Sequence, residues 1–184
     1  MVGSGTATQS FVEHLMLAPS GYAGDYNGGG STNPVLPDGF HGSANITSDQ
    51  PLASIVNEVA APATAGGPTT QSTAYNTFAV GVSAAHLPLV ENAGSDGVTT
   101  GVGIENISAS TASVTIAYYD ANNGNLLTQR TVSIPAGSFL GAYTPADLTT
   151  PGARATAVIS TSGNALAVIV NEVGAGTFMS YDGQ

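Results

Sequence analysis

One short sequence occurs twice in this chain, and it constrains the fold more than any single residue does. Residues 52–59 read Leu-Ala-Ser-Ile-Val-Asn-Glu-Val, and residues 166–173 read Leu-Ala-Val-Ile-Val-Asn-Glu-Val. The two copies are 114 residues apart (171 − 57). A repeat of this kind means that one supersecondary unit is built more than once. The sequence therefore predicts two related modules.

The residue pattern is that of β-strands throughout. Val114, Ile116 and Tyr118 alternate with small or polar residues, which is the period of a half-buried strand. Short strands separated by frequent Gly, Pro, Asn and Asp turns are typical of an immunoglobulin-like sandwich. We therefore predict an all-β fold, an Ig-like antiparallel β-sandwich with almost no helix. The expected strands are Thr6–Leu17, Ser43–Thr47, Leu52–Val59, Thr73–Val82, Leu87–Val90, Val98–Asn106, Ala112–Tyr119, Leu126–Ile134, Phe139–Tyr143, Arg154–Ser160, Ala165–Val173 and Thr177–Tyr181.

The two modules are unequal in length. The second has room for a full set of strands, whereas the first has the glycine-rich segment Pro19–Asp38 in the corresponding place. We predict an incomplete module over residues 1–78, short of about three strands, and a complete module over residues 79–184. The matching segments outside the main repeat are Gly39–Thr47 with Gly152–Ser160, Ser72–Asn76 with Phe178–Asp182, and His14–Leu17 with His86–Leu89.

These segments resemble a known kind of repeat. The string from Gly42 to Val59 contains Ser-Asp-Gln-Pro-Leu-Ala followed by Val-Asn-Glu, and Ala-Tyr-Asn-Thr-Phe follows it. It is similar to the tandem Ig-like β-sandwich repeats of bacterial cell-surface and secreted proteins. The resemblance covers most of residues 39–184 and implies a fold without implying a catalytic role. The chain departs from the repeat at Pro19–Asp38, and at Ser162–Ala165, where Asp-Gln-Pro is replaced.

Charge and cysteine content exclude several functions. The net charge is −10, with 2 Arg, no Lys and only 8% charged residues, against about a quarter in typical domains. Binding to nucleic acid or to anionic membrane surfaces depends on Lys and Arg, so neither partner is expected. No apolar run is long enough to span a membrane, and no cysteine is present. The composition favours an extracellular or cell-surface location, with a signal peptide absent or already removed.

The repeated Asn-Glu dipeptides are the most obvious catalytic candidates. Asn57-Glu58 and Asn171-Glu172 stand at strand ends, as the acid of many retaining glycosidases does. A glycosidase, however, needs both carboxyl groups within one site, about 5–10 Å apart. Since each module carries one dipeptide, we interpret the pairs as structural and predict no catalytic residues.

Metal binding has little support in the sequence. His14, His41 and His86 lack the i, i+4 spacing of a helical zinc site. The candidate calcium ligands are Asp25 and Asp120, which stand in the turns richest in Asp, Asn and Gly. Asp and Asn are also the ordinary residues of turns. Calcium binding is therefore an alternative hypothesis for these turns, and no cofactor is predicted.

Two function hypotheses remain. An incomplete sandwich exposes apolar faces and strand edges, which a second copy can cover by adding a strand. The leading hypothesis is therefore a structural filament or surface array in which the chain binds itself, with the N-terminal segment as donor strand. The expected assembly residues are Val2, Thr6, Thr8, Phe11, Val12, Leu15 and Leu17.

The alternative is a monomeric adhesion module that binds a glycan or a cell surface. Tyr22 and Tyr26 flank glycines in the long loop, and their rings could stack on a sugar. The two hypotheses differ in whether the protein self-associates.

Overall fold

The computed structural model describes residues 12–24, 42–60, 71–95, 97–174 and 176–183. The chain divides into two compact units, Met1–His41 and Gly42–Gln184. In the first unit, the described residues 12–24 form no strand and contain one tight turn, in which the Gly21 N–H donates to the Ala18 carbonyl at 2.8 Å. The second unit contains every described strand.

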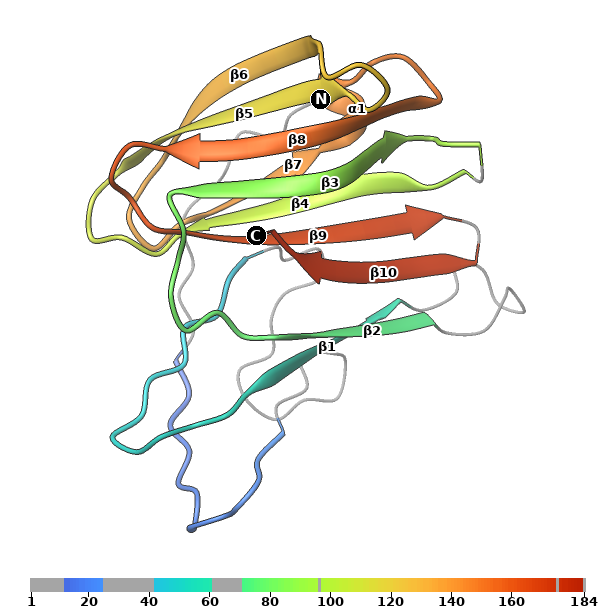
Figure 1. The fold of residues 1–184 in the computed structure, drawn as a ribbon. Coiled ribbons are helices and arrows are strands. Elements are labelled where there is room, and N and C mark those ends of the chain that lie inside the picture. Colours follow the sequence, from blue (N-terminus) through green and yellow to red (C-terminus); the bar gives the residue numbers. More distant parts are fainter. Residues whose placement is uncertain (1–11, 25–41, 61–70, 96, 175, 184) are drawn as a thin grey trace. The chain divides into compact units, whose positions relative to one another are not determined.

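The described residues of the second unit form ten strands and one short helix (Figure 1). They are β1 (Ile55–Ala60), β2 (Gln71–Asn76), β3 (Ala84–Asn92), β4 (Thr99–Asn106), β5 (Ala112–Asp120), β6 (Leu126–Ile134), β7 (Phe139–Tyr143), α1 (Thr144–Asp147), β8 (Ala153–Thr161), β9 (Leu166–Gly174) and β10 (Thr177–Asp182).

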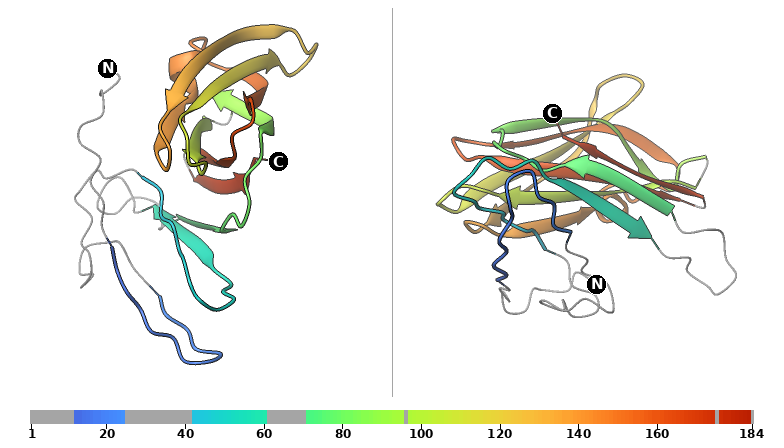
Figure 2. Two further views of the ribbon diagram at one scale, coloured as in Figure 1. Left: turned by 90° about the vertical axis from the view of Figure 1, so that its left-hand side faces the viewer. Right: turned by 90° about the horizontal axis from the view of Figure 1, so that it is seen from below.

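Two four-stranded antiparallel sheets face each other, as the left view of Figure 2 shows. One sheet has the order β10-β9-β4-β7 and the other β3-β8-β5-β6. A two-stranded sheet of β1 and β2 stands outside both. The predicted all-β antiparallel sandwich is confirmed, while its immunoglobulin-like character and the boundary at residue 78 stay predictions.

Alternating side chains from both sheets form one core. Along β4 every second residue is buried, and β5 follows the same period over its first half. Each fully buried Val, Leu or Ile stabilises the fold by about 1.5–3 kcal/mol relative to an exposed position. The largest fully buried apolar side chains are Tyr118, Leu87, Ile104, Ile116, Ile159, Leu166, Val90, Val114, Val168 and Val170.

Two of the strand predictions are wrong within the residues that the structure describes. Val12–Leu17 is not a strand, and neither is Ser43–Thr47. A strand needs the backbone of a neighbour to satisfy its N–H and C=O groups, and β propensity alone does not supply one. In the second segment, the Asn45 side chain instead donates to a Glu105 carboxylate oxygen at 3.2 Å.

The turn after β5 differs from the expected type. Asn123-Gly124 predicts a type I′ hairpin, which needs positive φ at both residues. Only Gly124 has it, at φ 74°. The loop is longer, because the Asp120 carboxylate accepts the N–H groups of Asn122 at 2.7 Å and Asn123 at 3.2 Å.

Asn106 joins two corners of the sandwich. Its side chain is 0% exposed. The amide donates to the carbonyls of Ser110 at 2.8 Å and Ile134 at 2.9 Å, and its oxygen accepts the Ser108 N–H at 3.1 Å. It therefore ties the end of β4 to the connections β4–β5 and β6–β7.

We predict that Asn106→Ala destabilises the protein by roughly 2–4 kcal/mol, because it leaves several buried backbone groups without partners. Urea unfolding followed by circular dichroism measures this change. The matched control is Asn122→Ala at an exposed turn position, with an expected effect below about 0.5 kcal/mol. Equal effects of the two substitutions would show that the Asn106 bonds do not hold the corner.

Candidate assembly site

The β1–β2 hairpin reproduces the β9–β10 hairpin in sequence and in register. Asn57 pairs with Ala74, and its counterpart Asn171 pairs with Ser180. Val56 pairs with Tyr75, as Val170 pairs with Tyr181. The internal repeat thus corresponds to a repeated piece of structure.

The surroundings of the two hairpins differ. In the complete sandwich Val170 is 0% exposed and Glu172 is 5% exposed. Their counterparts Val56 and Glu58 are only half-buried, and Leu52, the counterpart of the fully buried Leu166, is 48% exposed. The hairpin therefore carries the residues of a sandwich core without the burial of one.

Tyr181 shows what a complete module provides. Its hydroxyl donates to the Leu89 carbonyl of β3 at 2.6 Å, which joins the edge strands β10 and β3 of the two sheets. Burial, and next the Glu172 carboxylate, raise the pKa of Tyr181 to about 12. Burial also raises the pKa of the counterpart Tyr75, with Glu58 and Asp182 adding to the effect.

The first module has less chain than the second between the matching segments. Residues 93–152 hold β4, β5, β6 and β7, which span 8, 9, 9 and 5 residues. The corresponding stretch of the first module, residues 18–41, is shorter than these four strands together. Because residues 25–41 lie outside the described residues, the expected shortfall of about three strands stays a prediction.

Ser180 holds the hairpin beside β10. Its backbone N–H donates to the Thr73 hydroxyl at 3.0 Å. Its hydroxyl lies 2.6 Å from Asn171 Oδ1 and 3.3 Å from Glu58 Oε2. These are side-chain contacts, so β2 lies next to β10 (Figure 1) without becoming a fifth strand of that sheet.

The predicted assembly and binding residues fall in different parts of the chain. Val12, Leu15 and Leu17 lie in the described segment that forms no strand, and Tyr22 in the same segment is 90% exposed. The remaining candidates lie outside the described residues; they are Val2, Thr6, Thr8, Phe11, Asp25, Tyr26 and His41.

The two side chains of the Asn171-Glu172 dipeptide point to opposite faces of the sheet. Because side chains alternate along a strand, Asn171 faces outward to Ser180 while Glu172 is buried on the core side. The two Asn-Glu pairs are connected through Ser180, which contacts Asn171 of one repeat and Glu58 of the other. This arrangement is a structural link between the repeats.

Both cations of the chain are in ion pairs. Arg130 Nε lies 2.7 Å from Asp147, which also accepts the Tyr118 hydroxyl at 2.9 Å. Arg154 Nε lies 2.6 Å from Glu91. With 2 Arg and no Lys in the sequence, both arginines therefore lie against carboxylates of their own chain.

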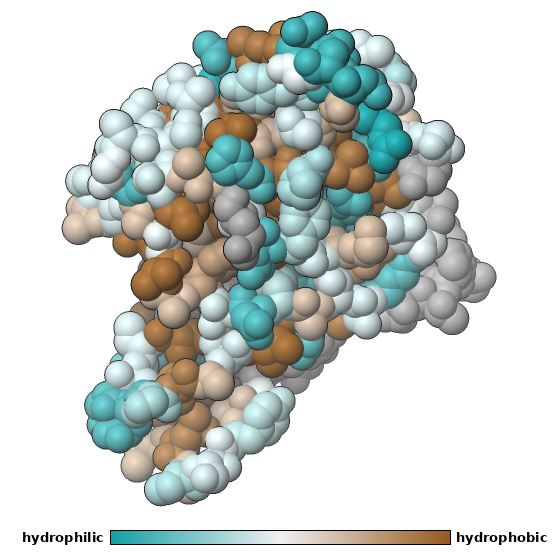
Figure 3. All heavy atoms as spheres, viewed as in Figure 1, coloured by the Kyte–Doolittle hydropathy of each residue, from teal (hydrophilic) through white to brown (hydrophobic). Residues whose placement is uncertain are grey.

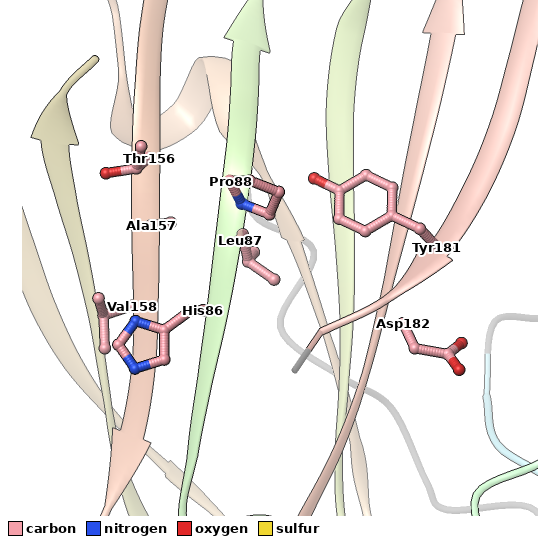
Figure 4. Close-up of a pocket in the computed structure, with 8 residues that line it drawn as sticks. All are labelled: His86, Leu87, Pro88, Thr156, Ala157, Val158, Tyr181 and Asp182. Atoms are coloured by element: carbon pink, nitrogen blue, oxygen red, sulfur yellow. The ribbon is translucent and has the colours of Figure 1, made fainter. Parts of the chain in front are cut away.

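A shallow depression of about 540 Å³ lies where β3, β8 and β10 meet (Figure 4). Tyr181 faces Pro88 across it, and His86 stands beside Val158. No group of three or more His, Asp or Glu side chains suited to a metal ion occurs in the part of the chain that the structure describes. Asp120, the described calcium candidate, binds the backbone of its own turn.

Sequence reasoning missed the contact between the hairpin and β10. The available signal was the difference between the repeats at one position, where Ala74 in the first corresponds to Ser180 in the second. The Ser180 hydroxyl makes the contact with Glu58, which the methyl group of Ala74 could not make. Within the described ranges of the chain, no helix is long and apolar enough to cross a membrane.

The comparisons with known proteins give little. No family model and no curated protein matches the chain. Among solved structures, the crystal structure of Thermotoga maritima 1070 is similar at 16% identity and a TM-score of 0.45, over 56% of this chain and 94% of that one. The Anabaena sensory rhodopsin transducer is similar at 13% identity and a TM-score of 0.41, over 53% of this chain and 100% of that one. Neither likeness is close enough to bear on function.

We predict that Ser180→Ala loosens the β1–β2 hairpin while leaving the sandwich intact, because Ser180 lies outside the core. Amide hydrogen exchange should become faster in β1 and β2 and stay unchanged in β4 and β5. The matched control is Ser113→Ala, an exposed serine of β5. Unchanged exchange in the hairpin would mean that other contacts hold it.

Stability should fall at high pH through the buried tyrosines. A raised folded-state pKa means that the stabilisation is complete below the unfolded tyrosine value of about 10. For Tyr181 it is lost as the pH rises from there towards about 12. Tyr181→Phe should reduce this alkaline loss, and should cost about 1 kcal/mol at pH 7 through the missing hydrogen bond. Urea midpoints between pH 7 and pH 11.5 measure both effects; equal alkaline slopes would contradict the assignment.

Proposed function

We propose that the protein is a non-enzymatic, extracellular structural protein that assembles into a filament or surface array by exchange of β-strands between copies. The observation that carries the proposal is the β1–β2 hairpin. It has the residues and register of β9–β10, but within the described residues it is a separate two-stranded sheet.

The physical argument concerns unsatisfied strand edges. An isolated two-stranded hairpin is marginally stable in water, and an exposed edge is a template for another chain. Leu52, Ile55 and Val59 are 48%, 60% and 55% exposed along this hairpin and the residues before it. Figure 3 shows apolar residues, drawn brown, at several places on a mostly pale surface. A second copy is a partner that would cover them.

The composition supports a protein that assembles outside the cell. A chain with 8% charged residues and no cysteine depends on backbone pairing and apolar burial for its cohesion. Both interactions become stronger in an ordered assembly, where every strand has neighbours. The N-terminal segment Val2–Leu17 is the proposed donor strand, because it is rich in β-forming residues.

The alternative proposal, a monomeric module binding a glycan or a cell surface, relies on Tyr22. Its side chain is 90% exposed, and the residues around it form no strand. Under this alternative Tyr22→Ala abolishes binding to a glycan array, and the protein remains monomeric at all concentrations.

We predict that the full chain shows concentration-dependent assembly, and that deletion of Met1–Gln9 reduces it strongly by removing the donor strand. Light scattering gives the particle mass, and negative-stain electron microscopy shows whether fibres form. Assembly that is unchanged by the deletion would reject this donor. A strictly monomeric full chain would reject the proposed function and favour the adhesion module.

A further inference from the structure

The two sheets of the sandwich divide into two halves. In the orders β10-β9-β4-β7 and β3-β8-β5-β6, the strands β4, β7, β5 and β6 form one half. The hairpin β1–β2 corresponds to β9 and β10 in the other half. The β1 edge that faces away from β2 therefore corresponds to the β9 edge that binds β4.

That β1 edge has no strand partner in the described part of the chain. In the complete module the equivalent β9 edge is fully used, and β4 pairs with it over eight residues, from Thr99 to Asn106. The β1 edge that faces away from β2 is therefore the edge at which a further strand would pair.

A matching edge exists at the other side of the sandwich. Among the described strands, β7 (Phe-Leu-Gly-Ala-Tyr) pairs with β4 alone, and it contains neither a charged residue nor proline. Natural proteins protect edges with such residues or with bulges. The edge strand β3 has both Pro88 and a register shift between Leu87 and Val90, so β7 is the less protected edge.

The two edges cannot meet within one chain. Ser180 holds the hairpin beside β10, while β7 lies at the opposite end of the same sheet. We propose that β1 of one copy adds to the β7 edge of a second copy and extends that copy's sheet. This inference rests on the proposed function and adds a second surface through which the copies bind, beside the N-terminal donor segment.

Strand direction and side-chain pattern agree with this pairing. β7 and β9 both run antiparallel to β4, so adding β1 antiparallel to β7 repeats the antiparallel pairing of its counterpart β9 with β4. Placing Asn57 opposite Gly141 repeats the pairing of Asn171 with Gly101 inside the complete module. It also places Ile55 opposite Tyr143, each 60% exposed in the single chain.

Because the two surfaces differ and lie at opposite ends of the molecule, the contact is head-to-tail. Such a contact leaves one β1 edge and one β7 edge open at the ends of every oligomer. Growth therefore continues, and it gives a filament where the rotation between successive copies does not close a ring.

Cysteine cross-linking tests the pairing directly, since the chain has no cysteine of its own. Full-length Ile55→Cys is mixed with full-length Tyr143→Cys and oxidised under assembly conditions. Opposite residues of neighbouring strands have the spacing that a disulfide needs. We expect a reducible heterodimer as the main product on a non-reducing gel. The matched control replaces Tyr143→Cys by Met179→Cys, a 52% exposed position on β10, and should give little heterodimer.

A second variant measures the same surface without a new bond. Ile55→Lys adds a charge to the β1 edge at an exposed position, so the monomer should fold normally, and assembly should be lost by light scattering. Met179→Lys is its control and should assemble. If the wild type assembles but the Ile55 and Tyr143 variants do not cross-link, and Ile55→Lys assembles normally, the β1–β7 pairing is wrong while the proposed function stands. If the wild type never assembles, both fail.

Discussion

The need of every β-strand edge for a backbone partner is the constraint from which the other features follow. In the complete sandwich each central strand has two neighbours, and Tyr181 joins the two sheets at one side through the Leu89 carbonyl. The β1–β2 hairpin has the same residues in the same register, with one strand edge unused among the described residues. Its core-type side chains are consequently only half-buried. Sequence identity between the repeats has produced the same local structure in two different environments.

Much of the fold could be predicted from the sequence, because strand period and turn residues are local signals. The span Phe139–Tyr143 is a strand as expected, and the matching segments 72–76 and 178–182 both follow the repeated strand as its hairpin partner. The failures at Val12–Leu17 and Ser43–Thr47 have one cause. Both segments have strand composition, but whether a strand forms depends on a partner, which composition does not specify.

The candidate site could be predicted less well, because it depends on differences between the repeats rather than on their likeness. The sequence drew attention to Asn57, Glu58, Asn171 and Glu172, which the two modules share. The contact that holds the hairpin comes from Ser180, whose counterpart is Ala74. A hydroxyl and a methyl group at equivalent positions look like ordinary variation until the structure shows Glu58 and Asn171 beside the hydroxyl.

The internal pairing of both arginines has a consequence for the medium in which copies can meet. Arg130 and Arg154 lie against carboxylates of their own chain, and two approaching molecules, each with a net charge of −10, repel each other. Their mutual repulsion extends about 30 Å in dilute fresh water and only a few ångströms in concentrated brine. Salinity thereby governs how closely these molecules can gather before any short-range contact forms.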